Sequence, residues 1–175
     1  MGTDKAFVEV DGVPMVERVA TALAAGGCDP VVLVGGDTVL LARFGWPVVP
    51  DRFPGEGPVG GVVTALEAVA DLATGERLVV ASCDLPLLDA ATVVALADAL
   101  DGSGAAVAVT DTWQLSLTAW RSSARDAVTQ AWEEGVRALR ELVVAVPHVE
   151  VAVAPEAVRN VNTPDDLSAA DGTTR

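Results

Sequence analysis

The chain has 175 residues, of which 51% are hydrophobic, and 25 acidic against 11 basic residues give a formal net charge of −14. The length is that of one domain with a sizeable core. Such an acidic chain is a poor candidate for binding nucleic acid or anionic membranes, because both need a basic surface. A single small anion held at a locally positive site is still compatible with this charge.

Two cysteines, Cys28 and Cys83, lie far apart and lack the spacing of metal ligands. No apolar run has the length of a membrane span. These observations predict a soluble cytoplasmic protein with reduced cysteines.

The apolar periodicity predicts helices and strands that alternate along the chain. A loop and a short hairpin, with a turn at Asp11-Gly12, fill the first fourteen residues. Helices are expected at 15–25, 38–44, 62–73, 89–100, 122–134, 136–143 and 164–170, and strands at 30–34, 47–50, 77–81, 105–110, 115–120 and 148–153. The alternation predicts a three-layer α/β/α fold with a mostly parallel sheet, which the hairpin at 105–120 makes mixed. Residues 1–170 form one domain in this interpretation, and residues 171–175 form a disordered tail.

The most informative segment is Val79-Val80-Ala81-Ser82-Cys83-Asp84-Leu85-Pro86. A run suited to a buried strand ends there in a single acid. In open α/β sheets the ligand crevice lies beyond the carboxyl ends of the strands, where a carboxylate can hold a divalent metal on a phosphate. The alternative is that Asp84 is a helix N-cap, and the local sequence favours neither interpretation.

Three further segments precede Asp84 at predicted loops. Lys5 follows a glycine-containing loop and could contact phosphate oxygens, or it could be an ordinary surface lysine. Val34 opens the segment Val34-Gly35-Gly36-Asp37, where glycines allow close approach to a base or a phosphate, although a simple strand-to-helix turn explains them too. The loop 50–61 contains Asp51, which could accept hydrogen bonds from the amino and ring N–H groups of guanine. It also contains Gly60, at the start of a helix whose N–H groups could bind an anion. The alternative is that this segment is a structural Ω-loop.

Two asparagines follow near the carboxyl end of the sequence. Thr163-Pro164 opens a helix, but helix capping does not explain Asn160 and Asn162. On an extended segment their side chains share one face, where their amides could bind phosphate, metal-bound water or a polar heterocycle. The sequence offers no histidine acid–base pair, serine nucleophile elbow or zinc motif. Lysine, aspartates and asparagines suit phosphoryl or nucleotidyl transfer, in which positioning and charge neutralisation matter most.

Taken together, five segments in order resemble the molybdenum cofactor guanylyltransferases, which are Rossmann-like nucleotidyltransferases. The resembling segments are Met1-Gly2-Thr3-Asp4-Lys5, Asp11-Gly12-Val13-Pro14-Met15, Gly57-Pro58-Val59-Gly60-Gly61, Ser82-Cys83-Asp84-Leu85-Pro86 and Asn160-Val161-Asn162-Thr163-Pro164. The resemblance implies transfer of GMP from Mg²⁺-GTP to the phosphate of molybdopterin, with release of pyrophosphate. It implies GTP and molybdopterin as ligands, and other cofactor-assembly proteins as potential partners.

The resemblance also implies roles for single residues. Lys5 would contact the GTP phosphates, and Asp84 would hold Mg²⁺ and orient the α-phosphate. Val34, Asp51 and Gly60 would lie on the nucleotide side of the site. Asn160, Asn162 and Arg137 would lie on the pterin or metal side, with Arg137 near the pterin-linked phosphate.

The sequence departs from the family pattern at its start and after its first long strand. Family members begin with a strand and a glycine-rich phosphate loop, of which Met1-Gly2 matches only the end. Members often carry an asparagine where this chain has Val34-Gly35-Gly36. Two alternatives therefore stand beside the guanylyltransferase: another nucleotidyltransferase of this fold, acting with CTP or on a sugar phosphate or phospholactate, and a non-catalytic nucleotide- or pterin-binding protein.

Overall fold

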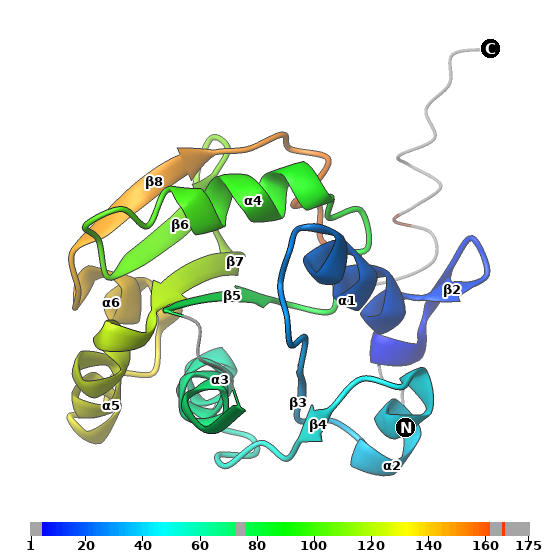
Figure 1. The fold of residues 1–175 in the computed structure, drawn as a ribbon, viewed down its shortest axis with the longest axis horizontal. Helices are drawn as coiled ribbons and strands as arrows, with labels where there is room; N and C mark the ends of the chain where they lie inside the picture. The colour runs from blue at the N-terminus through cyan, green and yellow to red at the C-terminus, as the bar shows by residue number, and fades with distance from the viewer. Residues whose placement is uncertain (1–4, 73–75, 162–165, 167–175) are drawn as a thin grey trace.

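A computed structural model describes residues 5–72, 76–161 and 166 (Figure 1). The helices are η1 (Lys5–Phe7), α1 (Met15–Ala25), α2 (Thr38–Leu41), η2 (Ala42–Phe44), α3 (Pro58–Leu72), α4 (Ala90–Asp98), η3 (Ser122–Ala124), α5 (Arg125–Glu133) and α6 (Leu139–Val144). The strands are β1 (Glu9–Val10), β2 (Val13–Pro14), β3 (Leu33–Val34), β4 (Val48–Val49), β5 (Arg77–Ala81), β6 (Ala105–Val109), β7 (Trp113–Arg121) and β8 (His148–Ala152). No helix in the described ranges is long and apolar enough to cross a bilayer.

The main sheet has four strands in the order β5-β7-β6-β8. β7 runs antiparallel to both of its neighbours, whereas β6 and β8 are parallel. Three of the four strands therefore share one direction, and only β7 in this sheet is reversed. The expected mixed, mostly parallel sheet is confirmed, and β8 lies at its edge.

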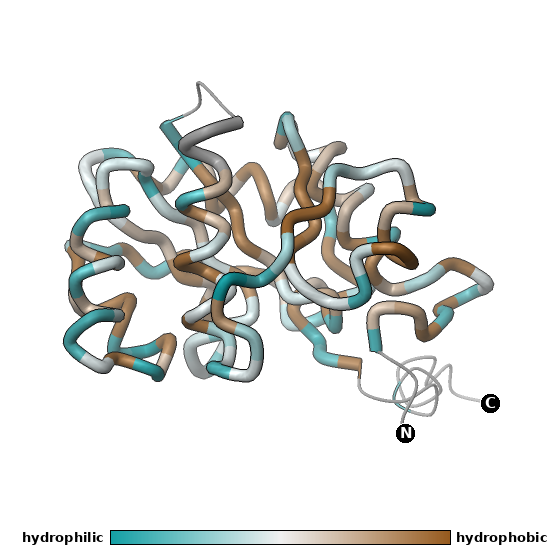
Figure 2. Tube along the Cα trace, turned by 90° about the horizontal axis from the view of Figure 1, so that it is seen from below, coloured by the Kyte–Doolittle hydropathy of each residue, from teal (hydrophilic) through white to brown (hydrophobic). Residues whose placement is uncertain are grey.

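Helices cover both faces of this sheet, with α4 and α1 on one side and α3, α5 and α6 on the other (Figure 1). The residues of β6 alternate between two cores, since successive side chains of a strand point to opposite faces. Ala105 and Val107 pack with α3, α5 and α6. Ala106 and Ala108 pack with α1 and α4. This gives the predicted three-layer α/β/α arrangement, and Figure 2 shows the hydrophobic segments running through the middle of the molecule.

Two smaller sheets complete the described part of the fold. β1 and β2 form the antiparallel hairpin expected around Asp11-Gly12, with Asp11 at a positive φ of 52°. β3 and β4 pair in parallel over two residues each. The strands predicted at 30–34 and 47–50 are therefore shorter than expected, because the only ladder that β3 makes in the described ranges is the one with β4.

Several helix boundaries also differ from the prediction. α1 has the expected bounds, and Asp89 caps α4 by accepting a hydrogen bond of 2.7 Å from the Thr92 amide. α3 begins at Pro58 rather than at residue 62, because proline is favoured in the first helical turn and needs no N–H partner there. The predicted final helix lies outside the described residues, apart from residue 166, and so does the predicted tail at 171–175.

Candidate functional site

Asp84 lies just beyond the carboxyl end of β5, as the sequence predicts. Its backbone carbonyl accepts a hydrogen bond of 2.9 Å from the Val161 amide. Its side-chain Oδ1 is buried and has no hydrogen-bond partner among the described residues. The helix that follows is capped by Asp89 instead, so the N-cap interpretation of Asp84 is wrong.

The Val161 contact brings the asparagine segment to Asp84. Asn160 is exposed, and its Oδ1 lies 3.5 Å from the Ser116 hydroxyl on β7. The Ser116 carbonyl in turn accepts from the Ser82 amide at 2.8 Å. The segments around Asp84, Ser116 and Asn160 therefore meet at one end of the sheet. Asn162 lies outside the described residues.

The amino-terminal segment packs against the same region. Ala6 shares a hydrophobic cluster with Val31 and Leu33, and Cys83 packs against that cluster. Val161 is fully buried with Val10 and Met15. Lys5, exposed at the start of η1, therefore belongs to a segment that lies beside the neighbours of Asp84.

A second group of candidate residues gathers at the ends of β3 and β4. The Gly35 amide, directly after Val34, donates to the Val49 carbonyl at 2.9 Å. A Cβ added to Gly35 would lie 3.4 Å from the Asp51 Cβ. The structure thus brings Val34 and Asp51 together across the β3–β4 ladder.

The Asp51 carboxylate organises the loop that leads to α3. Its Oδ1 accepts from the Phe53 amide at 2.9 Å and from the Thr64 hydroxyl at 3.2 Å, while that hydroxyl also lies 2.8 Å from the Gly60 carbonyl. A Cβ at Gly60 would lie 3.0 Å from the Phe53 Cβ. Close packing of this loop on α3 is thus one reason for glycine at position 60.

Arg137 is tied to the same loop. Its Nε lies 3.2 Å from Glu56 Oε2, and its guanidinium stacks 3.5 Å from the centre of the Trp132 ring. Its Nη1 also donates to the carbonyls of Trp132 and Val136 at 2.8 and 3.0 Å. The structure therefore places Arg137 against the loop of Asp51.

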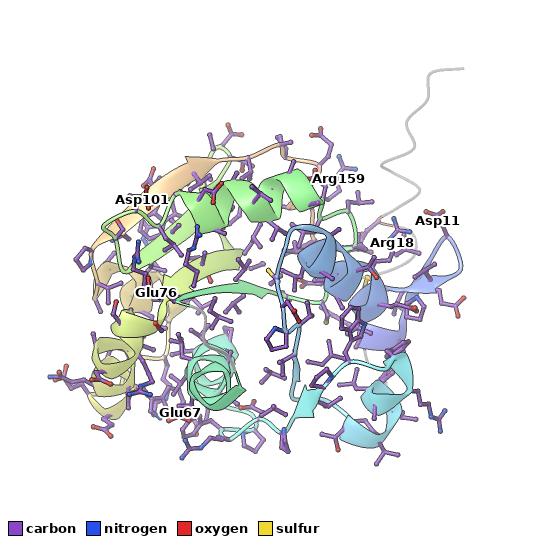
Figure 3. All side chains as sticks on the ribbon, in the orientation of Figure 1. Asp11, Arg18, Glu67, Glu76, Asp101 and Arg159 are labelled. Carbon is purple, nitrogen blue, oxygen red and sulfur yellow. The ribbon has the colours of Figure 1, made fainter. Side chains whose placement is uncertain are left out.

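Arg18 is a site-supporting residue that the sequence reasoning missed. From α1, its Nε donates to the Pro86 carbonyl at 2.9 Å, and its Nη1 lies 3.5 Å from Asp11 Oδ2 (Figure 3). It thereby fixes the turn that follows Asp84 to the hairpin. The sequence shows only that Arg18 stands beside the apolar stripe of the helix, because its partner Pro86 is 68 positions away.

The chemistry of Asp84 fits a magnesium ligand. A buried carboxylate oxygen without a partner is costly unless an ion or a ligand satisfies it. No cluster of three or more His, Cys, Asp or Glu side chains occurs within the described ranges. One carboxylate is nevertheless enough, because Mg²⁺ keeps several waters and binds substrate phosphates alongside one or two protein ligands.

Sequence comparison identifies the family. The family model described as MobA-like NTP transferase domain matches residues 1–159. A molybdenum cofactor guanylyltransferase of Rhodobacter capsulatus is 35% identical over 179 residues, which cover 98% of this chain and 88% of the relative. One of Rhizobium rhizogenes is 30% identical over 186 residues, covering 95% and 83% respectively.

Solved structures agree at the level of the fold. Molybdopterin-guanine dinucleotide biosynthesis protein A of Archaeoglobus fulgidus superimposes with a TM-score of 0.76 at 24% identity, over 97% of this chain and 90% of that one. The 2-C-methyl-D-erythritol 4-phosphate cytidylyltransferase of Thermus thermophilus gives a TM-score of 0.71 at 20% identity, over 95% and 92%. The chain is thus a nucleotidyltransferase and belongs to the family of MobA-like NTP transferase domains.

Proposed function

We propose that this protein transfers GMP from Mg²⁺-GTP to the terminal phosphate of molybdopterin. A phosphate oxygen of molybdopterin would attack the α-phosphorus of GTP, and the bond from that phosphorus to the α,β-bridging oxygen would break. The products would be the guanine dinucleotide cofactor and pyrophosphate. The names of the relatives support this choice of substrates.

The observation that carries the proposal is the buried, unpartnered Oδ1 of Asp84 at the carboxyl end of β5, among the described residues. Mg²⁺ bound there would neutralise charge on the triphosphate. No protein base is needed, because the attacking phosphate is already ionised at neutral pH. The role of this chain's residues is therefore to position two anions that repel each other.

The remaining candidates divide into two sides in this proposal. Lys5 supplies a positive charge for the GTP phosphates. Val34, Asp51 and Gly60 line the nucleotide side, where the first residues of α3 offer amide donors to an anion. Asn160, Asn162 and Arg137 would act on the pterin or metal side, with Arg137 near the pterin-linked phosphate.

The experiment compares Asp84→Asn with Asp89→Asn in an assay for conversion of molybdopterin to its guanine dinucleotide with Mg²⁺-GTP. Asp84→Asn should lower turnover on the order of 10²-fold or more, because a positioned charge is lost. Asp89→Asn is a matched control five positions away, since asparagine caps a helix about as well as aspartate. Unchanged turnover in Asp84→Asn, or tighter binding of Mg²⁺-CTP than of Mg²⁺-GTP by titration calorimetry, would contradict the proposal.

A further inference from the structure

Thr64 carries a buried hydroxyl group on α3, where its side chain is 1% exposed. Its Oγ1 lies 2.8 Å from the Gly60 carbonyl, four residues back along the helix, a contact that threonines commonly make in helices. Two further contacts leave the helix. The Oγ1 accepts from the Arg52 amide at 3.3 Å, and it lies 3.2 Å from Oδ1 of Asp51. One hydroxyl therefore joins α3 to the start of the loop 51–57, which leads to that helix.

The contact with Asp51 is the one that helix geometry does not explain. A threonine hydroxyl has one proton to donate and two lone pairs with which to accept. The Arg52 amide uses one lone pair, and both the Gly60 carbonyl and the Asp51 carboxylate lie within reach of the proton. The carboxylate is the stronger acceptor of the two, because hydrogen bonds to an ionised group are stronger than those between neutral groups.

Two donors meet on a single oxygen of Asp51. Its Oδ1 accepts from the Phe53 amide in the loop and from the Thr64 hydroxyl on α3. The Cβ–Cγ torsion of aspartate is soft, so hydrogen bonds rather than the torsion itself fix the plane of the carboxylate. The other oxygen, Oδ2, accepts no hydrogen bond from the described residues and is not sealed from solvent. Asp51 thus has one oxygen engaged by the protein and one available to a ligand.

Of the two donors, the one in the loop is held independently of Thr64. The Phe53 ring lies 4.5 Å from the ring of Trp132 on α5, and Trp132 is only 8% exposed. A Cβ on Gly60 would lie 3.0 Å from the Phe53 Cβ and 3.6 Å from Cη2 of Trp132, so the three residues are closely packed. Removal of the Thr64 hydroxyl would therefore leave the Phe53 amide in place and take away only the second anchor of the carboxylate.

We infer that Thr64 is a positioning residue whose hydroxyl orients the Asp51 carboxylate, so that Oδ2 accepts hydrogen bonds from guanine. The inference rests on the proposed use of GTP. Guanine presents its amino and ring N–H groups side by side, and one carboxylate oxygen has two lone pairs with which to accept them. A carboxylate that turns freely would present this acceptor for only part of the time, and the apparent affinity falls by the same fraction. Thr64 acts in this role only through Asp51.

The test compares the Kd of Mg²⁺-GTP with that of Mg²⁺-inosine triphosphate by titration calorimetry on the whole chain. Inosine triphosphate lacks the 2-amino group of guanine but keeps the sugar and the phosphates, so the ratio of the two Kd values reports the contact with the base. Thr64→Val removes the hydroxyl and should reduce the preference for GTP about fivefold or more, because hydrogen bonds to a charged group are strong. Thr64→Ser keeps the hydroxyl and should keep the preference. Asp51→Asn should abolish it, because the amide cannot accept at both positions.

Thr118→Val is the matched control, because Thr118 is also 1% exposed and its Oγ1 accepts from Nε1 of Trp120 at 2.9 Å, within the main sheet. It should lower the melting temperature and leave the preference for GTP unchanged. Thr64→Ala takes the place of Thr64→Val if the valine variant does not fold.

The outcomes separate this inference from the proposed function. A Thr64→Val variant that keeps the full preference, while Asp51→Asn loses it, would overturn the role of Thr64 and leave the proposed function standing. Equal weakening of both nucleotides in Thr64→Val, or loss of the preference in Thr64→Ser as well, would show a merely structural role. A whole chain that binds the two nucleotides equally would contradict the guanine contact of Asp51 and overturn the inference with it.

Discussion

Leu96 offers the most direct test of how the layers are packed. It lies on α4, is completely buried and packs in the cluster that contains Leu85, Leu117 and Ala106. Leu96→Ala removes three methylene equivalents, which corresponds to about 2.4 kcal/mol of transfer free energy. A fully enclosed site does not collapse completely, so the cavity left behind should raise the cost to roughly 3–5 kcal/mol.

Urea denaturation followed by circular dichroism would measure this loss of unfolding free energy. The melting temperature should fall by roughly 6–20 °C, since 1 kcal/mol corresponds to about 2–4 °C in a chain of this size. Val94→Ala is the matched control on the same helix, because Val94 is 43% exposed and its truncation should change stability by less than about 0.5 kcal/mol. Equal effects of the two substitutions would refute the assignment of this face of α4 to the core.

Three further predictions concern the loop that contacts Arg137, the packing of α1 on α4, and a partly buried thiol. In a double-mutant cycle on the free energy of unfolding, Arg137→Ala and Glu56→Ala should show a coupling energy of about 0.2–1 kcal/mol. Because both side chains are exposed, this coupling should disappear in 1 M salt, and a salt-independent coupling would contradict the prediction. Gly26→Ala should cost about 1–3 kcal/mol by chemical denaturation, since the new Cβ would lie 2.5 Å from Cγ1 of the completely buried Val93; a stabilised variant would contradict this packing. Burial raises the pKa of the Cys28 thiol. In the Cys83→Ser variant, alkylation of Cys28 should therefore be slow near neutral pH, and its rate should rise at a higher pH than the alkylation rate of a free thiol does.

The strong periodicities in the sequence gave reliable predictions of elements. The bounds of α1 and β5 agree with the structure, because one apolar stripe and one continuous apolar run respectively leave little choice. The position of Asp84 at a strand end followed from the same pattern. Boundaries set by tertiary contacts were less predictable, as for β3, whose apolar run extends beyond the two residues that pair with β4.

The site partners could not be predicted from local patterns. The contact of Arg18 with Pro86 spans 68 positions, and that of Arg137 with Glu56 spans 81. The stacking of the Arg137 guanidinium on Trp132 also joins residues that no local sequence pattern pairs. Such pairings depend on how α1, α5 and the loop 51–57 pack in three dimensions, which a single sequence does not specify.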